Sequence, residues 1–326
     1  MEKGIGILEK YELTVTNVSK GRGMLLLDTN CGKKKLVEYT GSKEHVNLQN
    51  KLPEHLSEAD RIYTDRILPN KDGEFFTTDY DGKKYVIKDH MEGIEADSRR
   101  ETDLMVMAKN LANLHKLMLL PKELYQEDMA KQRDLRAEFK SHNQELTKIR
   151  SFMRKKSSSR SFERRFLKEF ENFYQEGLAA FDSLEKSEYT RLSSQCMHLR
   201  SVCHGDYTYH NVINCGKYTA TVNFEKCHMG IQVEDLYMFL RKVLEKNRWD
   251  ISLGERLLSE YEKVRGLTKQ ERENLYIRLS FPEKFWKLAN QYYNGNKAWI
   301  SDKMLEKLEV TVELNQKKRE FLRYLI

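Results

Sequence analysis

The sequence predicts an α+β protein of two lobes, a small N-terminal lobe built on an antiparallel sheet and a larger, mainly helical C-terminal lobe. Strand-like patterns dominate residues 11–89, whereas apolar residues recur at helical spacing over most of residues 100–200 and from residue 233 onward. A chain of 326 residues with 39% hydrophobic residues and only 4 prolines can bury two such cores without long linkers. We place the boundary after Gly93, which gives lobes of residues 1–93 and 94–326.

The small lobe is expected to begin with two strands joined by a glycine-bearing loop. Tyr11–Val18 and Met24–Asp28 are rich in strand-forming residues and flank the segment Ser19-Lys-Gly-Arg-Gly23. A third strand follows over Lys33–Tyr39. A helix is predicted to start at Ser42, whose hydroxyl suits the N-cap position.

The strand pattern ends with one further hairpin. Glu74–Thr78 and Lys84–Asp89 bracket a Tyr80-Asp-Gly82 turn, so the small lobe should contain about five strands and one helix. Beyond Gly93 strand signals return only briefly, over residues 201–203, 212–214 and 220–224. The rest of the chain is predicted to be helical.

Composition argues against several classes of protein. No apolar run approaches the roughly 20 residues needed to cross a bilayer, and the N-terminus lacks the apolar core of a secretory signal. The 5 cysteines are odd in number and include no Cys-x-x-Cys pair, which argues against a disulfide framework or a zinc ribbon. We therefore expect a cytoplasmic protein with reduced thiols and no membrane partner.

Basic residues are concentrated in one segment. Residues 131–170 hold 13 Lys and Arg against 5 Asp and Glu, a balance of +8, while the whole chain has a formal charge of +7. With Phe152, Phe162 and Phe166 interleaved, this segment could bind a polyanion or an anionic protein partner. The alternative is a solvated helical face, which we favour because no recognised nucleic-acid module surrounds it; nucleic acid is therefore not the expected partner.

The segment most informative about chemistry is Val202-Cys-His-Gly-Asp-Tyr-Thr-Tyr-His-Asn-Val-Ile213, which lies between two short predicted strands. In phosphoryl transfer an aspartate accepts the proton of the attacking hydroxyl, and a nearby asparagine holds a metal ion on the nucleotide phosphates. Asp206 and Asn211 fit these two roles. His204 is expected to support the loop by packing and hydrogen bonding. The order His-Gly-Asp followed by Asn resembles the loop of kinase-like enzymes of the aminoglycoside-phosphotransferase branch.

This resemblance implies a metal-binding aspartate about a dozen residues further on, where the sequence has Asn223. A neutral amide is a poorer ligand than a carboxylate for a hard divalent cation. Glu225 lies two residues on, and in an extended strand it would point to the same side. Glu225 is therefore a second candidate metal ligand beside Asn211 and Asn223.

The small lobe departs from the pattern at the nucleotide site too. The strand lysine that would pair with the nucleotide phosphates aligns with Val37, whereas Lys35 lies on the same strand face two residues back, about 6.6–7 Å away. Lys35 could bridge part of that gap or be a partly solvated strand residue. Gly21 and Gly23 could let the first hairpin cover phosphates through backbone N–H groups, although a Gly-x-Gly in a hairpin can also serve only as a turn.

The chain as a whole resembles the CotS family of spore-coat proteins, relatives of aminoglycoside and choline kinases. The matching segments are Lys20–Gly23, Glu38–Ser42, His204–Asn211, Val233–Tyr237, Phe281–Tyr293 and Asn296–Trp299. The resemblance implies a bilobal protein-kinase-like fold and association with the spore coat. It also implies that Asp235 supports the catalytic loop from below, a role compatible with its other reading as a helix N-cap.

Three functions remain open at this stage. The departures at Val37 and Asn223 favour a coat-associated protein with weak or absent transferase activity that retains nucleotide binding. The second is an active phosphotransferase that uses ATP and Mg²⁺ to modify a hydroxyl of an unknown small-molecule acceptor, with Lys35 and Glu225 supplying the missing charges. The third is a basic scaffold that binds coat proteins or a polyanion through residues 131–170.

Overall fold

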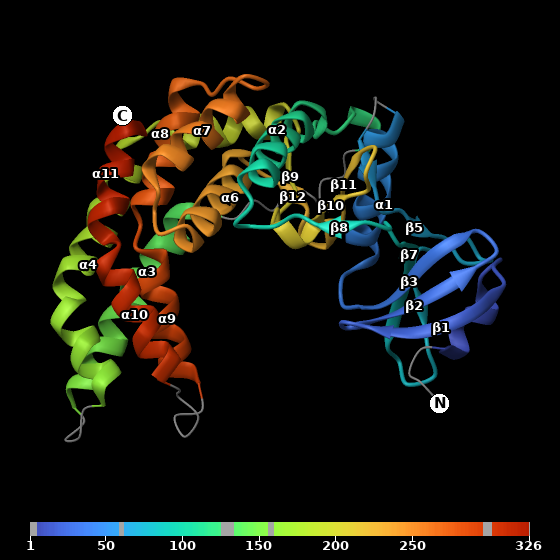
Figure 1. Cartoon of the computed structure of the whole chain (residues 1–326), viewed down its shortest axis with the longest axis horizontal. Helices are drawn as coiled ribbons and strands as arrows, with labels where there is room; N and C mark the ends of the chain where they lie inside the picture. Colours follow the sequence, from blue (N-terminus) through green and yellow to red (C-terminus); the bar gives the residue numbers. More distant parts are fainter. Residues whose placement is uncertain (1–4, 59–61, 125–133, 156–159, 296–301, 326) are drawn as a thin grey trace. The chain divides into compact units, whose positions relative to one another are not determined.

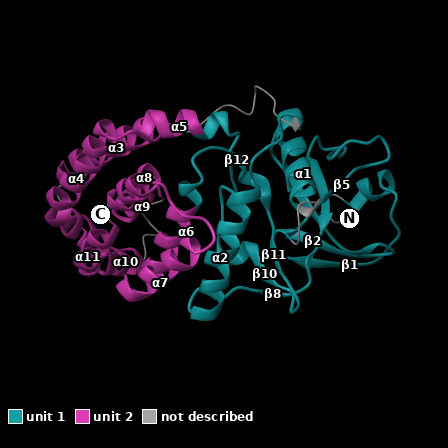
Figure 2. Ribbon diagram, turned by 90° about the horizontal axis from the view of Figure 1, so that it is seen from above, with its two compact units in different colours: residues 1–131, 196–235 teal, residues 132–195, 236–326 magenta. Residues whose placement is uncertain are grey.

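The computed structural model describes residues 5–58, 62–124, 134–155, 160–295 and 302–325. The chain forms two compact units, coloured separately in Figure 2. Unit 1 comprises residues 1–131 and 196–235, and unit 2 comprises residues 132–195 and 236–326. The predicted lobe boundary after Gly93 falls inside unit 1, and the division into lobes at that residue stays a prediction.

Unit 1 is built on an antiparallel sheet near the N-terminus (Figure 1). Its strands run in the order β1-β2-β3-β7-β5, and β6 also pairs with β7. The bounds are β1 Val15–Gly21, β2 Met24–Thr29, β3 Gly32–Tyr39, β5 Ile67–Leu68, β6 Thr77–Thr78 and β7 Lys84–Asp89. The predicted sheet is present, with the short strand β5 in addition to those expected.

The two faces of this sheet bury different clusters of side chains. On one face Leu36 and Ile87 pack with Ile7 and Tyr11, which come from the 3₁₀ segment Ile5–Lys10 and the residue after it. The prediction that Tyr11 begins a strand is wrong. Because Tyr11 is 2% exposed and turns its ring under the sheet, its apolar character reflects core packing rather than strand alternation.

The opposite face of the sheet packs against the one predicted helix, α1 (Lys43–Glu58). Val37 and Tyr39 of β3 join Val46 of α1 and Val86 of β7 in a small cluster. The Ser42 hydroxyl accepts from His45 N at 3.2 Å, as its predicted N-cap role requires. The branched apolar side chain of Val37 therefore stabilises the contact between helix and sheet.

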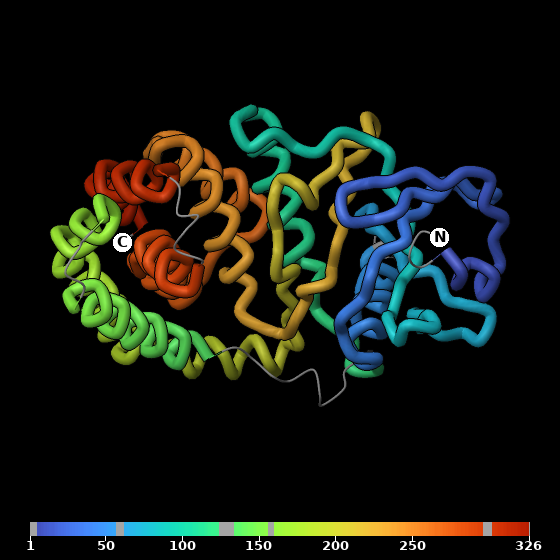
Figure 3. Tube along the Cα trace, turned by 90° about the horizontal axis from the view of Figure 1, so that it is seen from below, coloured from blue at the N-terminus to red at the C-terminus, as the bar shows by residue number. Residues whose placement is uncertain are grey.

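The remainder of unit 1 brings distant parts of the sequence together. A four-stranded sheet of order β4-β11-β10-β8 joins residues before 96 to residues after 200 (Figure 3), and the pair β12-β9 joins two segments that both lie after residue 200. The elements are β4 Tyr63–Thr64, β8 Ile94–Glu95, α2 Glu101–Leu117, 3₁₀ helix η2 Lys122–Leu124, β9 Val202–Cys203, η4 Tyr209–Asn211, β10 Val212–Asn214, β11 Thr219–Thr221, η5 Phe224–Lys226 and β12 His228–Met229. This pairing fixes the His-Gly-Asp loop next to the strands of the small sheet.

Unit 2 is helical in the residues described. Its helices are α3 Leu135–Arg154, α4 Ser161–Lys186, α7 Ile251–Glu262, α8 Lys269–Ser280, α9 Glu283–Asn294, α10 Asp302–Glu313 and α11 Asn315–Leu325. Helices α5 (Tyr189–His198) and α6 (Val233–Lys246) each contain one point where the chain passes from one unit to the other. The α+β class predicted from the sequence is confirmed. Among the described helices, none is long and apolar enough to cross a membrane.

An aromatic core holds the unit 2 helices together. Phe166 and Phe173 of α4 stack on Phe285 of α9 at centroid distances of 4.9 and 4.3 Å, and Phe162 stacks on Tyr292 at 4.5 Å. The Tyr292 hydroxyl donates to the buried Glu163 at 2.5 Å. These helical positions are thus occupied by core residues.

Replacing Thr268 by alanine should lower the free energy of unfolding by about 1 kcal/mol, because Thr268 is the N-cap of α8. Its hydroxyl accepts from Glu271 N at 3.2 Å, and the Glu271 carboxylate accepts from Thr268 N at 3.0 Å, which completes a capping box. Urea denaturation followed by circular dichroism measures the loss. Thr268→Ser keeps the hydroxyl and should lose much less; an equal loss in both variants would contradict the capping explanation.

Candidate functional site

The His-Gly-Asp loop follows β9 and is held from within unit 1 by a buried carboxylate. Asp235 is 0% exposed, and its two oxygens accept from His204 N at 2.6 Å and Gly205 N at 2.9 Å. Nε2 of His115, on α2, lies 3.3 Å from the same carboxylate. Because Asp235 accepts hydrogen bonds from two consecutive backbone N–H groups, its position suits a residue that fixes the conformation of the loop.

His204 is completely buried and contacts the residue that follows β11. Its Nε2 lies 3.1 Å from the Val222 carbonyl, and its Nδ1 accepts from Asp206 N at 3.2 Å. Both ring nitrogens are thus used by the protein backbone. This geometry suits a supporting role for His204 in the loop.

Asp206 faces a lysine that the sequence interpretation did not consider. Lys226 Nζ donates to Asp206 Oδ2 at 2.8 Å, with the lysine side chain 60% exposed and the aspartate side chain 30% exposed. The Asp206 carbonyl accepts from Asn211 Nδ2 at 2.9 Å, so the loop closes on itself. The carboxylate proposed as a base therefore forms an ion pair with an ammonium group.

The two asparagines proposed as metal ligands are hydrogen-bonded to each other. Asn223 Nδ2 donates to Asn211 Oδ1 at 2.8 Å, and Asn223 Oδ1 accepts from Lys35 Nζ at 2.7 Å. Asn223 has a left-handed backbone with φ of 67°, a conformation that asparagine tolerates better than most residues. Its amide N–H donates to Asp65 Oδ1 at 2.9 Å, which fixes this turn.

Two lysines from neighbouring strands share one buried aspartate beside Asn223. Lys35 of β3 and Lys88 of β7 are direct partners in the sheet register. Facing like charges destabilise a sheet, but here Asp65 Oδ2 lies 3.0 Å from Lys35 Nζ and 3.6 Å from Lys88 Nζ. Asp65 is 2% exposed. This group of three residues, the buried charge cluster, holds two lysines and one carboxylate, and the Glu225 carboxylate beside Lys88 supplies the second negative charge.

The neighbouring charges shift the pKa values of Asp65 and Lys88. Burial alone would raise the pKa of Asp65, but the ammonium groups of Lys88 and Lys35, with hydrogen bonds from Lys35 and Asn223 N, hold it at about 2. Burial likewise opposes the charged form of Lys88, yet Asp65 and Glu225 raise its pKa above the ordinary value. Asp65 and Lys88 are therefore both ionised at neutral pH.

Glu225 is committed to contacts with the small sheet and α1. Its carboxylate forms an ion pair with Lys88, and its carbonyl lies 2.7 Å from His45 Nε2 and 3.3 Å from Gln49 Nε2. These contacts fix the segment after Asn223 against α1. Glu225 thus serves as a counterion for a buried lysine in this arrangement.

The hairpin glycines Gly21 and Gly23 lie at the turn between β1 and β2. Gly21 pairs with Met24, and Gly23 has φ of +71°, which the turn requires. The hairpin turn is thus confined to Arg22 and Gly23, tighter than the five-residue loop expected. Covering of phosphates by this hairpin stays a prediction.

The residues at the expected metal position do not fit a magnesium ion as they are placed. Mg²⁺ prefers carboxylate and other oxygens in nearly octahedral geometry. The amide oxygens of Asn211 and Asn223 each accept a hydrogen bond, and the Glu225 carboxylate is paired with Lys88. Binding of a dication here would have to displace Lys35 or Lys88 from these oxygens.

Asp65, Lys88 and Lys226 were missed in the sequence. For Lys88 a signal existed, because in the alternating strand Lys84–Asp89 it shares a face with the buried Val86. Asp65 lies between two-residue strands, β4 and β5, that are too short to show a pattern. Lys226 is the last residue of the 3₁₀ helix η5, whose direction the sequence did not indicate.

The basic segment of residues 131–170 falls on α3 and α4, apart from residues 131–133 and 156–159, which lie outside the described residues. Phe162 and Phe166 are buried in the unit 2 core rather than displayed among the basic side chains. Arg165 pairs with Glu169 and Glu309 at 2.6 and 2.9 Å. These contacts match the helical-face interpretation of this segment. Of the segments that carried the resemblance, Asn296–Trp299 also lies outside the described residues.

The antiparallel sheet, the helix α1 against it and the buried loop from His204 to Asn211 define a kinase-like phosphotransferase fold. An aminoglycoside phosphotransferase from Alicyclobacillus acidocaldarius subsp. acidocaldarius DSM 446 shares it with a TM-score of 0.85 at 16% identity, over 98% of this chain and 93% of that one. A spectinomycin phosphotransferase solved with ADP and spectinomycin aligns with a TM-score of 0.64 at 11% identity, over 97% and 96% of the two chains. At these identities the likeness concerns the fold alone.

The chain belongs to the family described as "Spore coat putative kinase YutH", whose model matches residues 6–325. Spore coat protein S of Bacillus subtilis (strain 168) is 26% identical over 163 residues, which are 49% of this chain and 46% of that protein. The match thus spans about half the length of this curated relative. The resemblance to the CotS family of spore-coat proteins is confirmed.

Proposed function

We propose that this spore-coat family member is a kinase-like protein that binds a nucleotide without the catalytic magnesium ion and transfers phosphoryl groups weakly or not at all. The observation that carries the proposal is the position of Asn223, whose amide oxygen accepts from Lys35 and whose amide nitrogen donates to Asn211. At the position where a kinase has a metal-binding carboxylate, this chain has a neutral amide whose oxygen and nitrogen are both hydrogen-bonded.

The local charge balance supports the same proposal. Lys35, Lys88 and Lys226 face Asp65, Glu225 and Asp206, three cations against three anions. A magnesium ion would need oxygens that now neutralise lysines. Lys35, by contrast, brings an ammonium group next to Asn223, where a nucleotide phosphate could replace the amide oxygen as its partner.

Two structural relatives that were solved with nucleotides support the general class of ligand. A spectinomycin phosphotransferase was solved with ADP, and an amicoumacin kinase with AMP-PNP and Ca²⁺ at a TM-score of 0.58 and 10% identity. The proposal therefore concerns ATP binding and its dependence on metal.

Changing Asn223 to aspartate should create a dependence on magnesium that the wild type lacks, because it restores a carboxylate at the metal position. We expect calorimetric affinity for ATP to be equal within about threefold in Mg²⁺ and in EDTA for the wild type, whereas Asn223→Asp should gain about tenfold from Mg²⁺, a difference of about 1.4 kcal/mol.

Asn214→Asp is the matched control, since it adds the same charge at an exposed position of β10. It should behave as the wild type does. Magnesium-dependent ATP hydrolysis or transfer by the wild type that is lost in Asp206→Asn would overturn the proposal and establish an active kinase. Absence of any ATP binding in either buffer would leave a coat protein without a nucleotide ligand, which also contradicts the proposal.

A further inference from the structure

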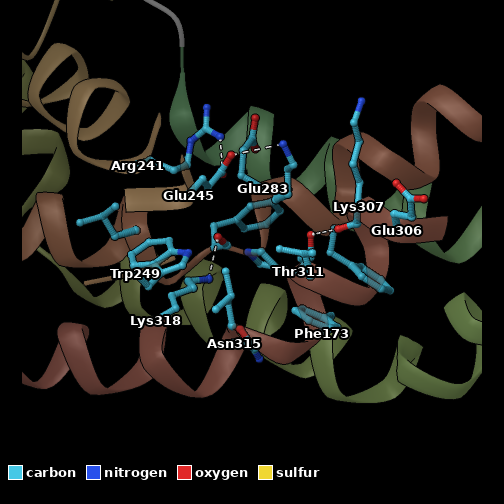
Figure 4. A pocket seen from close by; sticks show the side chains of 17 residues that line it. Phe173, Arg241, Glu245, Trp249, Glu283, Glu306, Lys307, Thr311, Asn315 and Lys318 are labelled. Atoms are coloured by element: carbon cyan, nitrogen blue, oxygen red, sulfur yellow. Dashed lines mark hydrogen bonds and ion pairs between the residues drawn. The ribbon is translucent and has the colours of Figure 1, made fainter. Parts of the chain in front are cut away.

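Unit 2 contains a cavity of about 330 Å³ that is separate from all residues of the candidate site. Its walls come from α4, α6, α8, α9, α10 and α11 and from the segments next to them. Phe173, Phe281 and Phe285 supply aromatic surface, and Figure 4 shows Arg241 and Trp249 among the side chains around the hollow. A mostly apolar cavity with a few charged groups is the usual form of a small-molecule site.

The polar wall of the cavity has hydrogen-bonding capacity that the protein does not use. Arg241 is 7% exposed, and its Nη1 donates to Glu245 Oε1 at 2.8 Å. Within the described residues, Nε of Arg241 is buried without a hydrogen-bond partner. A guanidinium has five N–H donors, so Arg241 can donate to Glu245 and still donate to a second anionic group.

The charge around the cavity favours an anion. Four basic and three acidic side chains line it, which leaves one cation in excess. Glu245 is shared by Arg241 and Lys284, the latter at 3.3 Å, so one carboxylate balances two cations. A ligand with one negative charge would complete this balance in a partly desolvated site.

Trp249 occupies its place in the wall at a conformational cost. Arg248 and Trp249 both have left-handed backbones, with φ of 53° and 51°, which bulky residues rarely adopt. Trp249 is nevertheless 7% exposed, and its ring lies 6.1 Å from Phe321. Strained residues of this kind are found more often at ligand sites than elsewhere.

We propose that this cavity binds a small carboxylate with an apolar body, whose ring or chain packs on the phenylalanines and whose carboxylate is bound by Arg241. An engineered apolar cavity of about 150 Å³ takes up benzene. A cavity of about 330 Å³ can therefore hold one ring with a short side chain. A buried guanidinium forms a stronger hydrogen bond with a carboxylate than with a neutral acceptor.

The test uses the full chain and 3-phenylpropionate as the probe, with 3-phenylpropanamide as its neutral counterpart of similar size. Calorimetry should show binding of the acid and binding of the amide that is about tenfold weaker or more. Arg241→Lys keeps the positive charge next to Glu245 but removes Nε, and it should weaken binding of the acid by about tenfold.

A second pair of variants tests the location independently of Arg241. Val310 lies on α10 at the cavity and is 40% exposed, so Val310→Trp can fill the space without disturbing a closed core. It should abolish binding. Lys303→Trp places the same side chain at an exposed position of α10 outside the cavity wall and should leave binding unchanged.

Three outcomes would overturn the proposal. These are no binding of the acid by the folded wild type at millimolar concentration, equal binding of acid and amide, and binding unaffected by Val310→Trp. Since no residue of the cavity belongs to unit 1, these results are independent of whether the chain binds ATP.

Discussion

Replacing Asp65 by alanine should lower the free energy of unfolding of unit 1 by about 3–5 kcal/mol, because it removes the shared counterion of two buried lysines. The side chains of Lys35 and Lys88 are 7% and 2% exposed, so water cannot take over the role of the carboxylate. Urea denaturation followed by circular dichroism gives the total loss. Hydrogen exchange of amides in β3 and β7 locates it.

The pH dependence of stability provides the control for this prediction. The pKa of Asp65 is about 2 in the folded protein against an ordinary value of 3.8, so its stabilising contribution is complete above about pH 5 and is lost as pH falls towards 2. The loss amounts to about 2 kcal/mol and should be absent from Asp65→Ala. A variant that is as stable as the wild type at pH 7, or that keeps the same acid slope, would show that the buried charge cluster does not stabilise the fold.

Replacing Gly205 by alanine should lower the free energy of unfolding by at least about 3 kcal/mol and prevent the His-Gly-Asp loop from closing. Two penalties combine at this residue, a strained backbone conformation and a steric clash of the new Cβ. Gly205 has φ of +79°, and a Cβ there would lie 2.0 Å from the Lys226 carbonyl oxygen. The backbone carbonyl cannot move aside cheaply, because Lys226 ends the turn after Asn223. The midpoint of thermal unfolding should fall accordingly.

Gly216→Ala separates the two penalties. Gly216 has φ of +81°, almost the same as Gly205, but a Cβ there would have nothing within 4 Å. Its replacement should therefore cost only the conformational term of about 1 kcal/mol. Equal losses in the two variants would show that the close approach of Gly205 to Lys226 has no energetic importance.

Much of the fold could be predicted, because its elements carry periodic signals. The helical spacing of apolar residues predicted α2 and the aromatic helices of unit 2, and the hairpin pattern around residue 22 predicted β1 and β2. The start of β1 was placed too early, at Tyr11 rather than Val15, since Tyr11 is apolar for a reason unrelated to strand alternation. Short strands such as β4 and β5 have too few residues for any period.

Candidate site residues could be proposed from the sequence only where they belong to a short motif or match a family pattern. Asp206 and Asn211 were proposed from the order of residues in the His-Gly-Asp loop and Asn223 from the family resemblance, and the structure places the two asparagines in direct contact. The left-handed turn at Asn223 and the sharing of Asp65 by Lys35 and Lys88 depend on tertiary packing, and no local pattern encodes them. The departures at Val37 and Asn223 were visible in the sequence, but their consequence required the geometry.

The ion pair between Lys226 and Asp206 should be more sensitive to salt than the buried charge cluster. Because the Lys226 side chain is 60% exposed, dissolved ions can screen this pair, whereas Lys88 and Asp65 are shielded from them. At about 1 M salt the screening length falls to about 3 Å, close to the 2.8 Å of the contact. Rising ionic strength would therefore weaken the ion pair between Lys226 and Asp206 and leave the pairing of Lys88 with Asp65 largely unchanged.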